Sequence, residues 1–128
     1  RLFASSLYQI DEKKRAYIEI NKAFDLNTDE YGKWRTLFEM WRFNFNDDNI
    51  EEARKISKEI VRIQPDYVQS YIAALASSDK KNKISDTYKK KIFETMPNFS
   101  PAMIKNFHSW IRPDQAEKLR SALEKFNI

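Results

Sequence analysis

The stretch from Asn49 to Ala76 constrains the fold most, because it predicts two helices joined by a short turn at Pro65. Before the proline, apolar residues recur three or four positions apart, as on one stripe of an α-helix: Ile50, Ala53, Ile56, Ile60, Val61 and Ile63. Pro65 ends this helix, since a proline restricts the residue before it and has no amide hydrogen to donate. The helical spacing resumes after Asp66, a candidate N-cap, with Tyr67, Val68, Tyr71, Ile72, Ala74 and Leu75. The stretch therefore predicts an antiparallel helical hairpin.

The composition extends this prediction to the whole chain. One glycine and four prolines among 128 residues leave few positions for β-hairpins, phosphate-binding loops or barrel corners. The hydrophobic fraction of 41% is enough to form a core, and the length fits one domain. With no cysteine, the chain has no disulfide and no thiol chemistry. We therefore expect a single all-α domain.

Two capping boxes are predicted at the starts of the central helices. Asn27 with Glu30 and Asn49 with Glu52 have the three-residue spacing in which each side chain can satisfy an amide of the first turn. The first box opens a helix that we expect to run from about Asp29 to Phe45. Between the two helices, residues 44–49 form a predicted polar turn.

Helical spacing also predicts elements at both ends of the chain. Leu2, Phe3, Leu7 and Tyr8 are the expected tail of a first helix, and Asp11 is the candidate cap of the next one. A long helix is expected to end at Pro97, and Ser100 with Pro101 opens a short one. The last helix has one apolar face, which consists of Ala116, Leu119, Leu123 and Phe126.

The hairpin resembles the tetratricopeptide repeat (TPR) family. The residues that carry the resemblance are Ile50-Glu51-Glu52-Ala53, then Ile60, Pro65-Asp66-Tyr67 and Tyr71. Thr28, Pro65 and Pro97 mark equivalent turns 37 and 32 positions apart, on either side of the repeat length of about 34. The resemblance implies a right-handed α-solenoid of antiparallel helix hairpins. It divides the chain into a partial first repeat (1–28), a second (29–65), a third (66–97) and a C-terminal helical cap (98–128).

The closing residues are similar to the TPR regions of bacterial regulators. Pro97-Asn98-Phe99-Ser100, Phe107 and Ala116-Glu117-Lys118-Leu119 resemble the end of such regions in transcription activators of the CadC/ToxR/HilA type and in some class III adenylate cyclases. This implies a non-catalytic, protein-binding module of a regulator, most of all a transcriptional one. Because the chain begins Arg1-Leu2-Phe3 without an initiator Met, we expect a fragment with a DNA-binding or cyclase domain upstream. We favour a cytoplasmic location, with the periplasm as the alternative for a membrane-anchored ToxR/CadC-type regulator.

The family's partner-binding positions lie on the concave face of the first helices. Carried over to this sequence, those positions are Arg35, Glu39, Arg42, Phe43, Gln69, Ile72, Ala76, Asp79 and Lys80. Arg35, Glu39 and Arg42 share one helix face, so an intrahelical salt bridge is one interpretation. The other is that both arginines grip a carboxylate or carbonyl of a bound protein or peptide segment.

The charge of the chain leaves alternatives open. The net charge is +4, and lysines 80, 81, 83, 89, 90 and 91 form the strongest cluster. We interpret this cluster as a solvated face, with contact to phosphate or an anionic membrane as the alternative. We do not expect direct binding to nucleic acid, because the aromatic residues fall on the predicted core stripes. The alternatives to protein binding are a structural module that forms a homodimer and a nucleic-acid-binding helical repeat.

Catalysis and metal binding are not expected. His108 is the only histidine, and no serine has a base and an orienting acid at a fixed spacing. Asp47-Asp48 lacks the spaced ligands, the central glycine and the final glutamate of an EF-hand. We therefore predict no enzyme activity, cofactor or metal. No apolar run reaches the ~18 residues of a membrane span, so we expect no span in this segment, and we do not predict a signal peptide in it.

Overall fold

The computed structural model covers the 128-residue chain and describes residues 4, 7–8, 12–79, 82–104 and 113–128. Helix is the regular structure throughout these ranges, which confirms the prediction of an all-α chain. The elements are α2 (Lys13–Leu26), α3 (Glu30–Asn46), α4 (Ile50–Ile63), α5 (Val68–Ala76), α6 (Lys83–Thr95), η1 (Pro101–Met103) and α8 (Pro113–Glu124).

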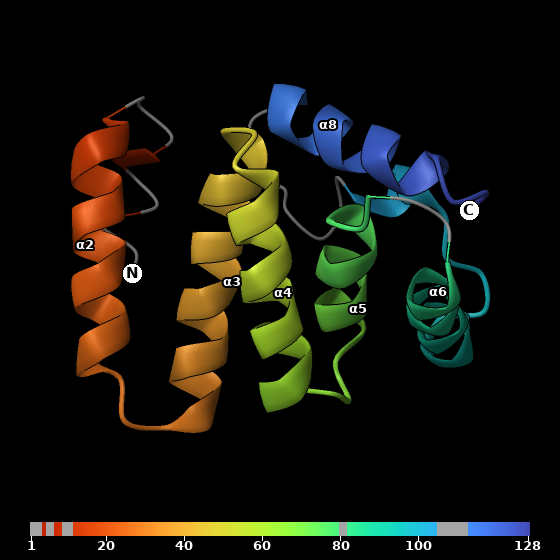
Figure 1. Ribbon diagram of the computed structural model, residues 1–128, viewed down its shortest axis with the longest axis horizontal. Helices are drawn as coiled ribbons and strands as arrows, with labels where there is room; N and C mark the ends of the chain where they lie inside the picture. Colours follow the sequence, from red (N-terminus) through yellow and green to blue (C-terminus); the bar gives the residue numbers. More distant parts are fainter. Residues whose placement is uncertain (1–3, 5–6, 9–11, 80–81, 105–112) are drawn as a thin grey trace.

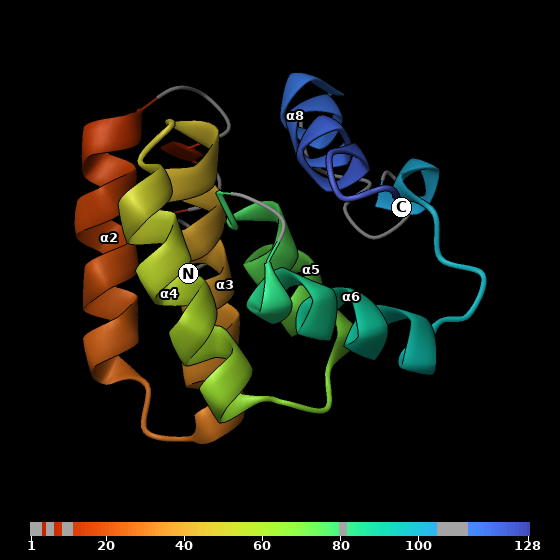
Figure 2. The same cartoon turned by 45° about the vertical axis from the view of Figure 1, so that its right-hand side comes forward.

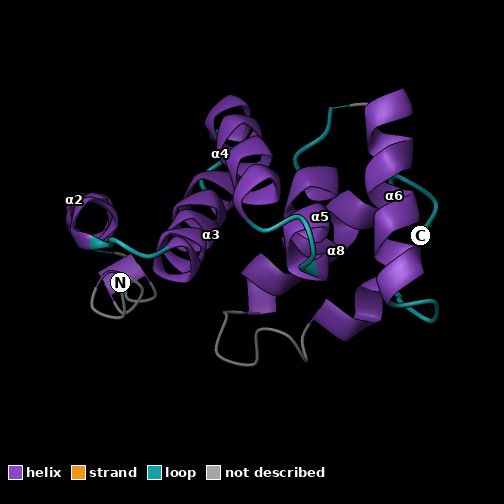
Figure 3. Cartoon of the chain, turned by 90° about the horizontal axis from the view of Figure 1, so that it is seen from below, coloured by secondary structure: helices purple, strands orange, loops and turns teal. Residues whose placement is uncertain are grey.

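The helices from α2 to α6 pack in chain order, each against the next (Figure 1). The turned view in Figure 2 and the view from below in Figure 3 show the same succession. The last helix departs from it, because α8 crosses the stack and packs against α5 and η1. In Figure 1 it lies over the end of the stack where α3 and α5 finish and α4 begins.

The main core runs through the middle of the stack. It is built from the apolar faces of α3, α4 and α5 together with side chains from α6 and the C-terminal segment, including Trp41, Ile60, Leu75, Ile92 and Leu123. A second, smaller core joins the N-terminal residues to α2 and α3 and consists of Ala4, Leu7, Tyr8, Ala16, Ile20 and Phe43. The predicted face of the last helix is confirmed at Leu119, Leu123 and Phe126, which are buried.

The start of α3 differs from the predicted capping box. The Asp29 carboxylate, not the Asn27 side chain, accepts the hydrogen bond from the backbone N–H of Gly32, at 2.7 Å. Asn27 instead donates to the Ala23 carbonyl at 3.0 Å and to the Thr36 hydroxyl at 2.8 Å, because it also ends α2. A Cβ on Gly32 would lie 2.8 Å from the Asn27 side-chain oxygen, so glycine fits this crowded turn.

Other caps also differ in their partners. Asn49 precedes α4 as predicted, but its side chain makes no cap hydrogen bond and donates to the Asn44 side chain at 3.4 Å. Tyr67, not Asp66, is the N-cap residue of α5. A capping box that we did not predict joins Asn82 and Ser85 at the start of α6. The predicted polar turn before α4 is shorter than expected, since α3 continues to Asn46 and the turn closes at Asp48, whose φ is 63°.

Candidate functional site

The structure places the predicted partner-binding residues in two different environments. Arg35 and Asp79 are exposed and Gln69 is half-buried, whereas Ile72 and Ala76 are buried. Lys80 lies outside the described residues, as does His108. The predicted residues therefore do not form one continuous accessible face.

Three predicted residues of α3 lie in the interior, which corrects the expectation that they are accessible. The exposed fractions are 5% for Glu39, 2% for Arg42 and 0% for Phe43. Phe43 is covered by the N-terminal residues and α2, and its ring stacks on that of Tyr8 with 4.3 Å between centroids. Glu39 and Arg42 form an intrahelical ion pair of 2.6 Å, so the salt-bridge interpretation holds for these two residues. Burial lowers the pKa of Arg42, and the Glu39 carboxylate opposes that effect.

Arg35 belongs to a small aromatic surface at the other end of α3, which we call the Tyr31 surface (Tyr31, Arg35 and Tyr67). The Tyr31 side chain is 48% exposed, although large aromatic groups are usually more buried. The Arg35 guanidinium lies 5.7 Å from the centre of the Tyr31 ring and donates to its hydroxyl at 3.2 Å. Tyr67 meets Tyr31 edge to face at 6.5 Å and packs on the buried ring of Trp34 at 4.8 Å. These contacts fix an arginine and two tyrosines in one accessible patch.

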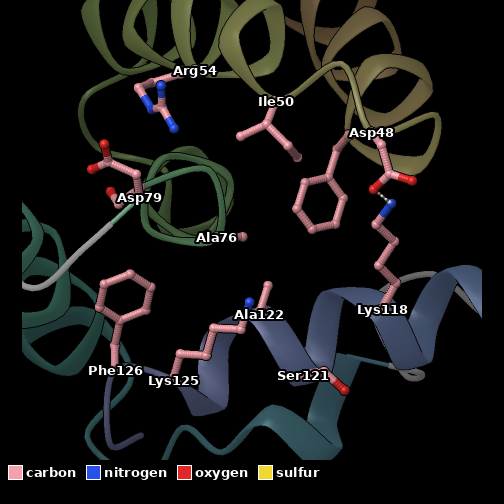
Figure 4. A pocket seen from close by; sticks show the side chains of 12 residues that line it. Asp48, Ile50, Arg54, Ala76, Asp79, Lys118, Ser121, Ala122, Lys125 and Phe126 are labelled. Atoms are coloured by element: carbon pink, nitrogen blue, oxygen red, sulfur yellow. Dashed lines mark hydrogen bonds and ion pairs between the residues drawn. The ribbon is translucent and has the colours of Figure 1, made fainter.

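A hollow of about 570 Å³ lies between α8 and the stack (Figure 4). Its apolar lining comes from four helices and the residues after α8: Phe45, Ile50, Ala76, Ala122 and Phe126. Its polar lining consists of Asp48, Arg54, Ser78, Asp79, Lys118, Ser121 and Lys125. Of the predicted binding residues that the structure describes, Ala76 and Asp79 contribute to this lining.

The charged groups around this hollow differ in how they are paired. Lys118 forms an ion pair with Asp48 and also donates to the Asn46 carbonyl at 3.3 Å. Arg54 donates from Nε to the Ser77 carbonyl at 3.1 Å, which fixes the guanidinium at the end of α5. Within the described part of the chain, no hydrogen bond or ion pair engages Lys125, Asp79 or the terminal nitrogens of Arg54.

A second hollow of about 150 Å³ adjoins the first. The two share Arg54, Ser78 and Asp79 in their linings, and the smaller one extends toward Ile84 and Tyr88 of α6. The end of α5 therefore borders both hollows. The prediction from sequence missed this region, because Arg54, Lys118 and Lys125 come together only through the path of α8 across the stack, which no periodic pattern indicates.

Asp47 is the centre of a separate polar cluster at the end of α3. Its carboxylate accepts hydrogen bonds from Tyr8 at 2.9 Å and Tyr17 at 2.8 Å, and it forms a 2.9 Å ion pair with Lys13. Burial acts to raise the pKa of Asp47, but the bonds from Lys13, Tyr17 and Tyr8 outweigh it and hold the pKa below its usual value. Burial, followed by the contact with Asp47, raises the pKa of both tyrosines. Both hydroxyls therefore stay protonated and donate to the carboxylate.

The described residues do not assemble a metal centre or a membrane-crossing element. No three His, Cys, Asp or Glu side chains within these ranges lie close enough together to hold a metal ion. None of the described helices has both the length and the apolar character needed to cross a membrane. Comparison of the chain with protein-family models, with curated proteins and with solved structures found no match.

Proposed function

We propose that the chain is a non-catalytic module of the tetratricopeptide type that binds a segment of another protein. In this proposal, the helices form a right-handed solenoid in which α3 and α5 are the first helices of successive pairs and α8 is the cap. The packing of α2 to α6 in chain order supports it. Two side-chain pairs between α3 and α5, Trp34–Ser70 and Trp41–Ser77, each span 36 residues, which is close to the repeat length of about 34.

The Tyr31 surface is the observation that supports protein binding most directly. Tyrosine, tryptophan and arginine are enriched at the residues that contribute most to protein–protein affinity. Here Tyr31 and Arg35 are accessible, and their contacts with each other and with Tyr67 hold them in place before binding. Side chains that are already ordered lose less conformational entropy when a partner binds. Gln69, another of the predicted residues, is half-buried near the start of α5.

The closing residues resemble the TPR regions of bacterial regulators, and this resemblance supports a partner from a bacterial regulatory system. We infer a transcriptional regulator first, with an adenylate cyclase as the second choice, and an output domain elsewhere in the same protein. The segment bound would be a short piece of that domain or of a separate signalling protein. The chemistry of the Tyr31 surface favours a segment that offers a carbonyl or carboxylate to Arg35 and an apolar side chain to the rings.

Selection of binding peptides tests the proposal. A displayed library of random peptides, selected on the immobilised chain, should yield sequences whose affinity falls at least tenfold when Tyr31→Ala or Arg35→Ala is introduced. Two variants serve as matched controls: Ile84→Ala removes an exposed apolar side chain of α6, and Arg120→Ala removes an arginine of α8. Both controls should leave the affinity unchanged. Equal losses in all four variants, or no selected peptide, would contradict the proposal.

The alternative roles make different predictions in solution. A structural module would form a dimer at all concentrations in size-exclusion chromatography with light scattering, whereas the proposed module would be a monomer. A nucleic-acid-binding repeat would bind oligonucleotides with an affinity that falls steeply as salt is added. Binding at low salt that shows this dependence would replace protein binding as the proposed function.

A further inference from the structure

The hollow beneath α8 is lined by both apolar and charged side chains. Apolar side chains from α3, α4 and the C-terminal segment face one another across it, among them Phe45, Ile50 and Phe126. The side chains of Arg54 and Lys125 approach it from different sides, one from α4 and one from the end of α8 (Figure 4). An apolar interior with a few charged groups is the usual composition of a small-ligand site.

The pairing of the charges determines which ligand charge fits. Asp48 and Lys118 neutralise each other in their ion pair. The remaining charged groups of the lining are Arg54, Lys125 and the Asp79 carboxylate. With the ion pair included, the lining contains three basic and two acidic residues. This balance fits a ligand with one negative charge better than a doubly charged phosphate. The terminal nitrogens of Arg54 make no bond to the described protein, and a planar guanidinium suits a carboxylate.

The volume agrees with a small organic molecule. About 570 Å³ lies within the range of roughly 300–1,000 Å³ that is usual for such sites. We propose that this hollow binds a small organic acid, with its carboxylate between Arg54 and Lys125 and its apolar body against Phe45, Ile50 and Phe126. This site is separate from the Tyr31 surface and does not depend on the protein-binding role proposed above.

The test uses three probes that share one apolar body: 4-phenylbutyrate, 4-phenylbutan-1-ol and 4-phenylbutylamine. Each is titrated into the ¹⁵N-labelled chain at pH 7, with the backbone amides of Ser78 and Ser121 as reporters of the hollow. We expect the acid to shift these amides and to bind at least tenfold more tightly than the alcohol or the amine. The reason is that only the acid forms charge-assisted hydrogen bonds with the two cations.

Variants that remove one positive charge test whether Arg54 and Lys125 cause the tighter binding of the acid. Arg54→Met and Lys125→Met keep most of the apolar stem, and each should weaken 4-phenylbutyrate about tenfold. Lys55→Met is the control, since Lys55 is an exposed lysine of the same helix that does not line the hollow. Arg54 also bonds the end of α5, so Lys125→Met, which removes no bond to the described protein, keeps the test valid if the first variant is unstable.

Several results would overturn the proposal. Equal affinity for the acid and the alcohol would show that the cations do not recognise the ligand. Shifts confined to other amides would place the ligand elsewhere. No binding of the acid at millimolar concentration would show that the hollow does not take such a ligand. Binding of the dipeptide acetyl-Phe-Glu-amide without binding of the acid would assign the hollow to a protein segment instead.

Discussion

Asp47 joins three parts of the molecule through a single carboxylate. Tyr8 belongs to the N-terminal residues, Lys13 and Tyr17 belong to α2, and Asp47 itself ends α3. Each bond is charge-assisted, because the carboxylate stays ionised. The cluster lies beside the small second core, where few apolar side chains are available, so these bonds should contribute noticeably to the stability of the N-terminal part.

We expect Asp47→Asn to lower the free energy of unfolding by about 1–3 kcal/mol. The amide keeps one oxygen acceptor, but it loses the ion pair with Lys13 and cannot accept at both of its side-chain atoms. Urea denaturation followed by circular dichroism measures the change. Asp25→Asn is the matched control on the exposed side of α2, and it should change the free energy by no more than about 0.5 kcal/mol.

The same variant predicts a pH dependence. Because the pKa of Asp47 in the folded chain is below its usual 3.8, its stabilising effect is fully present above that value and is lost as the pH falls through the folded pKa. The difference in free energy of unfolding between the wild type and Asp47→Asn should therefore be largest near neutral pH and shrink below 3.8. A difference that stays constant down to strongly acidic pH would show that the charge of Asp47 does not act as described.

For single residues, the sequence predicted the place along a helix better than the hydrogen-bond partner. The sequence correctly places Asn27 and Asn49 next to helix termini, after α2 and before α4. Both side chains, however, bond to side chains outside the predicted capping boxes. Glu39 and Arg42 were expected on an open face because they stand at groove-facing positions of the family that the hairpin resembles, but tertiary packing buries both residues. Local spacing cannot decide between an exposed and a buried helix face when the covering segment is distant in sequence.

At the scale of elements, α3 and α5 are held together by two equivalent hydrogen bonds. The indole N–H of Trp34 donates to Ser70 at 3.0 Å, and that of Trp41 donates to Ser77 at 2.6 Å, about two helical turns further along. Each serine hydroxyl in turn donates to a backbone carbonyl, of Gln64 and Ala73 respectively. Both indoles are buried, so water cannot replace the serine as acceptor for either indole N–H.

We expect Ser70→Ala and Ser77→Ala each to lower the free energy of unfolding by about 1–3 kcal/mol, because each leaves a buried indole donor without its acceptor. Ser57→Ala is the matched control, since Ser57 is a buried helical serine that donates to the Arg54 carbonyl but accepts from no indole. It should cost clearly less. If all three substitutions have the same effect in urea denaturation, the indole bonds do not stabilise the contact between α3 and α5.

Most of the elements could be predicted because their causes are local. Apolar spacing located α4 and the faces of α5 and α8, and the prolines marked the ends of α4 and α6. The capping box at the start of α6 was not predicted, because it depends on a reciprocal bond between Asn82 and Ser85 that apolar spacing does not indicate. The proposed solenoid geometry and the repeat family stay predictions.

At the scale of the whole molecule, polar bonds attach the C-terminal segment to the stack at two places, the middle of α8 and the residues just after it. Lys118 reaches the end of α3, where it bonds Asn46 and Asp48. Lys89 of α6 donates to the carbonyls of Phe126 at 3.0 Å and Asn127 at 3.3 Å, just beyond the C-terminal end of α8. Between these attachments the large hollow borders α8, while Leu119 and Leu123 of the same stretch are buried in the main core.

We expect Lys89→Met to increase the hydrogen exchange rate of backbone amides in residues 123–127 about tenfold, with no change in α3. The methionine keeps the apolar stem and removes the donor to both carbonyls. Hydrogen exchange with mass spectrometry measures the rates. Lys90→Met, at the exposed neighbouring position, is the control and should leave them unchanged. Faster exchange in both variants would trace the effect to α6 itself.

The candidate sites show where prediction from sequence ends. Arg35 and Gln69 could be proposed because they stand at groove-facing positions of the family that the hairpin resembles. The hollow could not be predicted, because the residues that line it are far apart in sequence. Asp48 and Lys118, for example, come together only because α8 folds back onto the stack. Contacts of this kind depend on the path of the chain in space, which residue spacing does not encode.

The two tryptophan–serine bonds also limit how much the length of this chain can vary among homologous proteins. Both span 36 residues, and the segment common to both spans is residues 41–70. An inserted or deleted codon within α4 would turn the rest of α4 by about 100° relative to its first part, which would displace the start of α5 and strain both indole–serine bonds. Gene lineages should therefore keep the length of this segment constant, or change it only by compensated pairs, while α6 lies outside both spans and escapes that restriction.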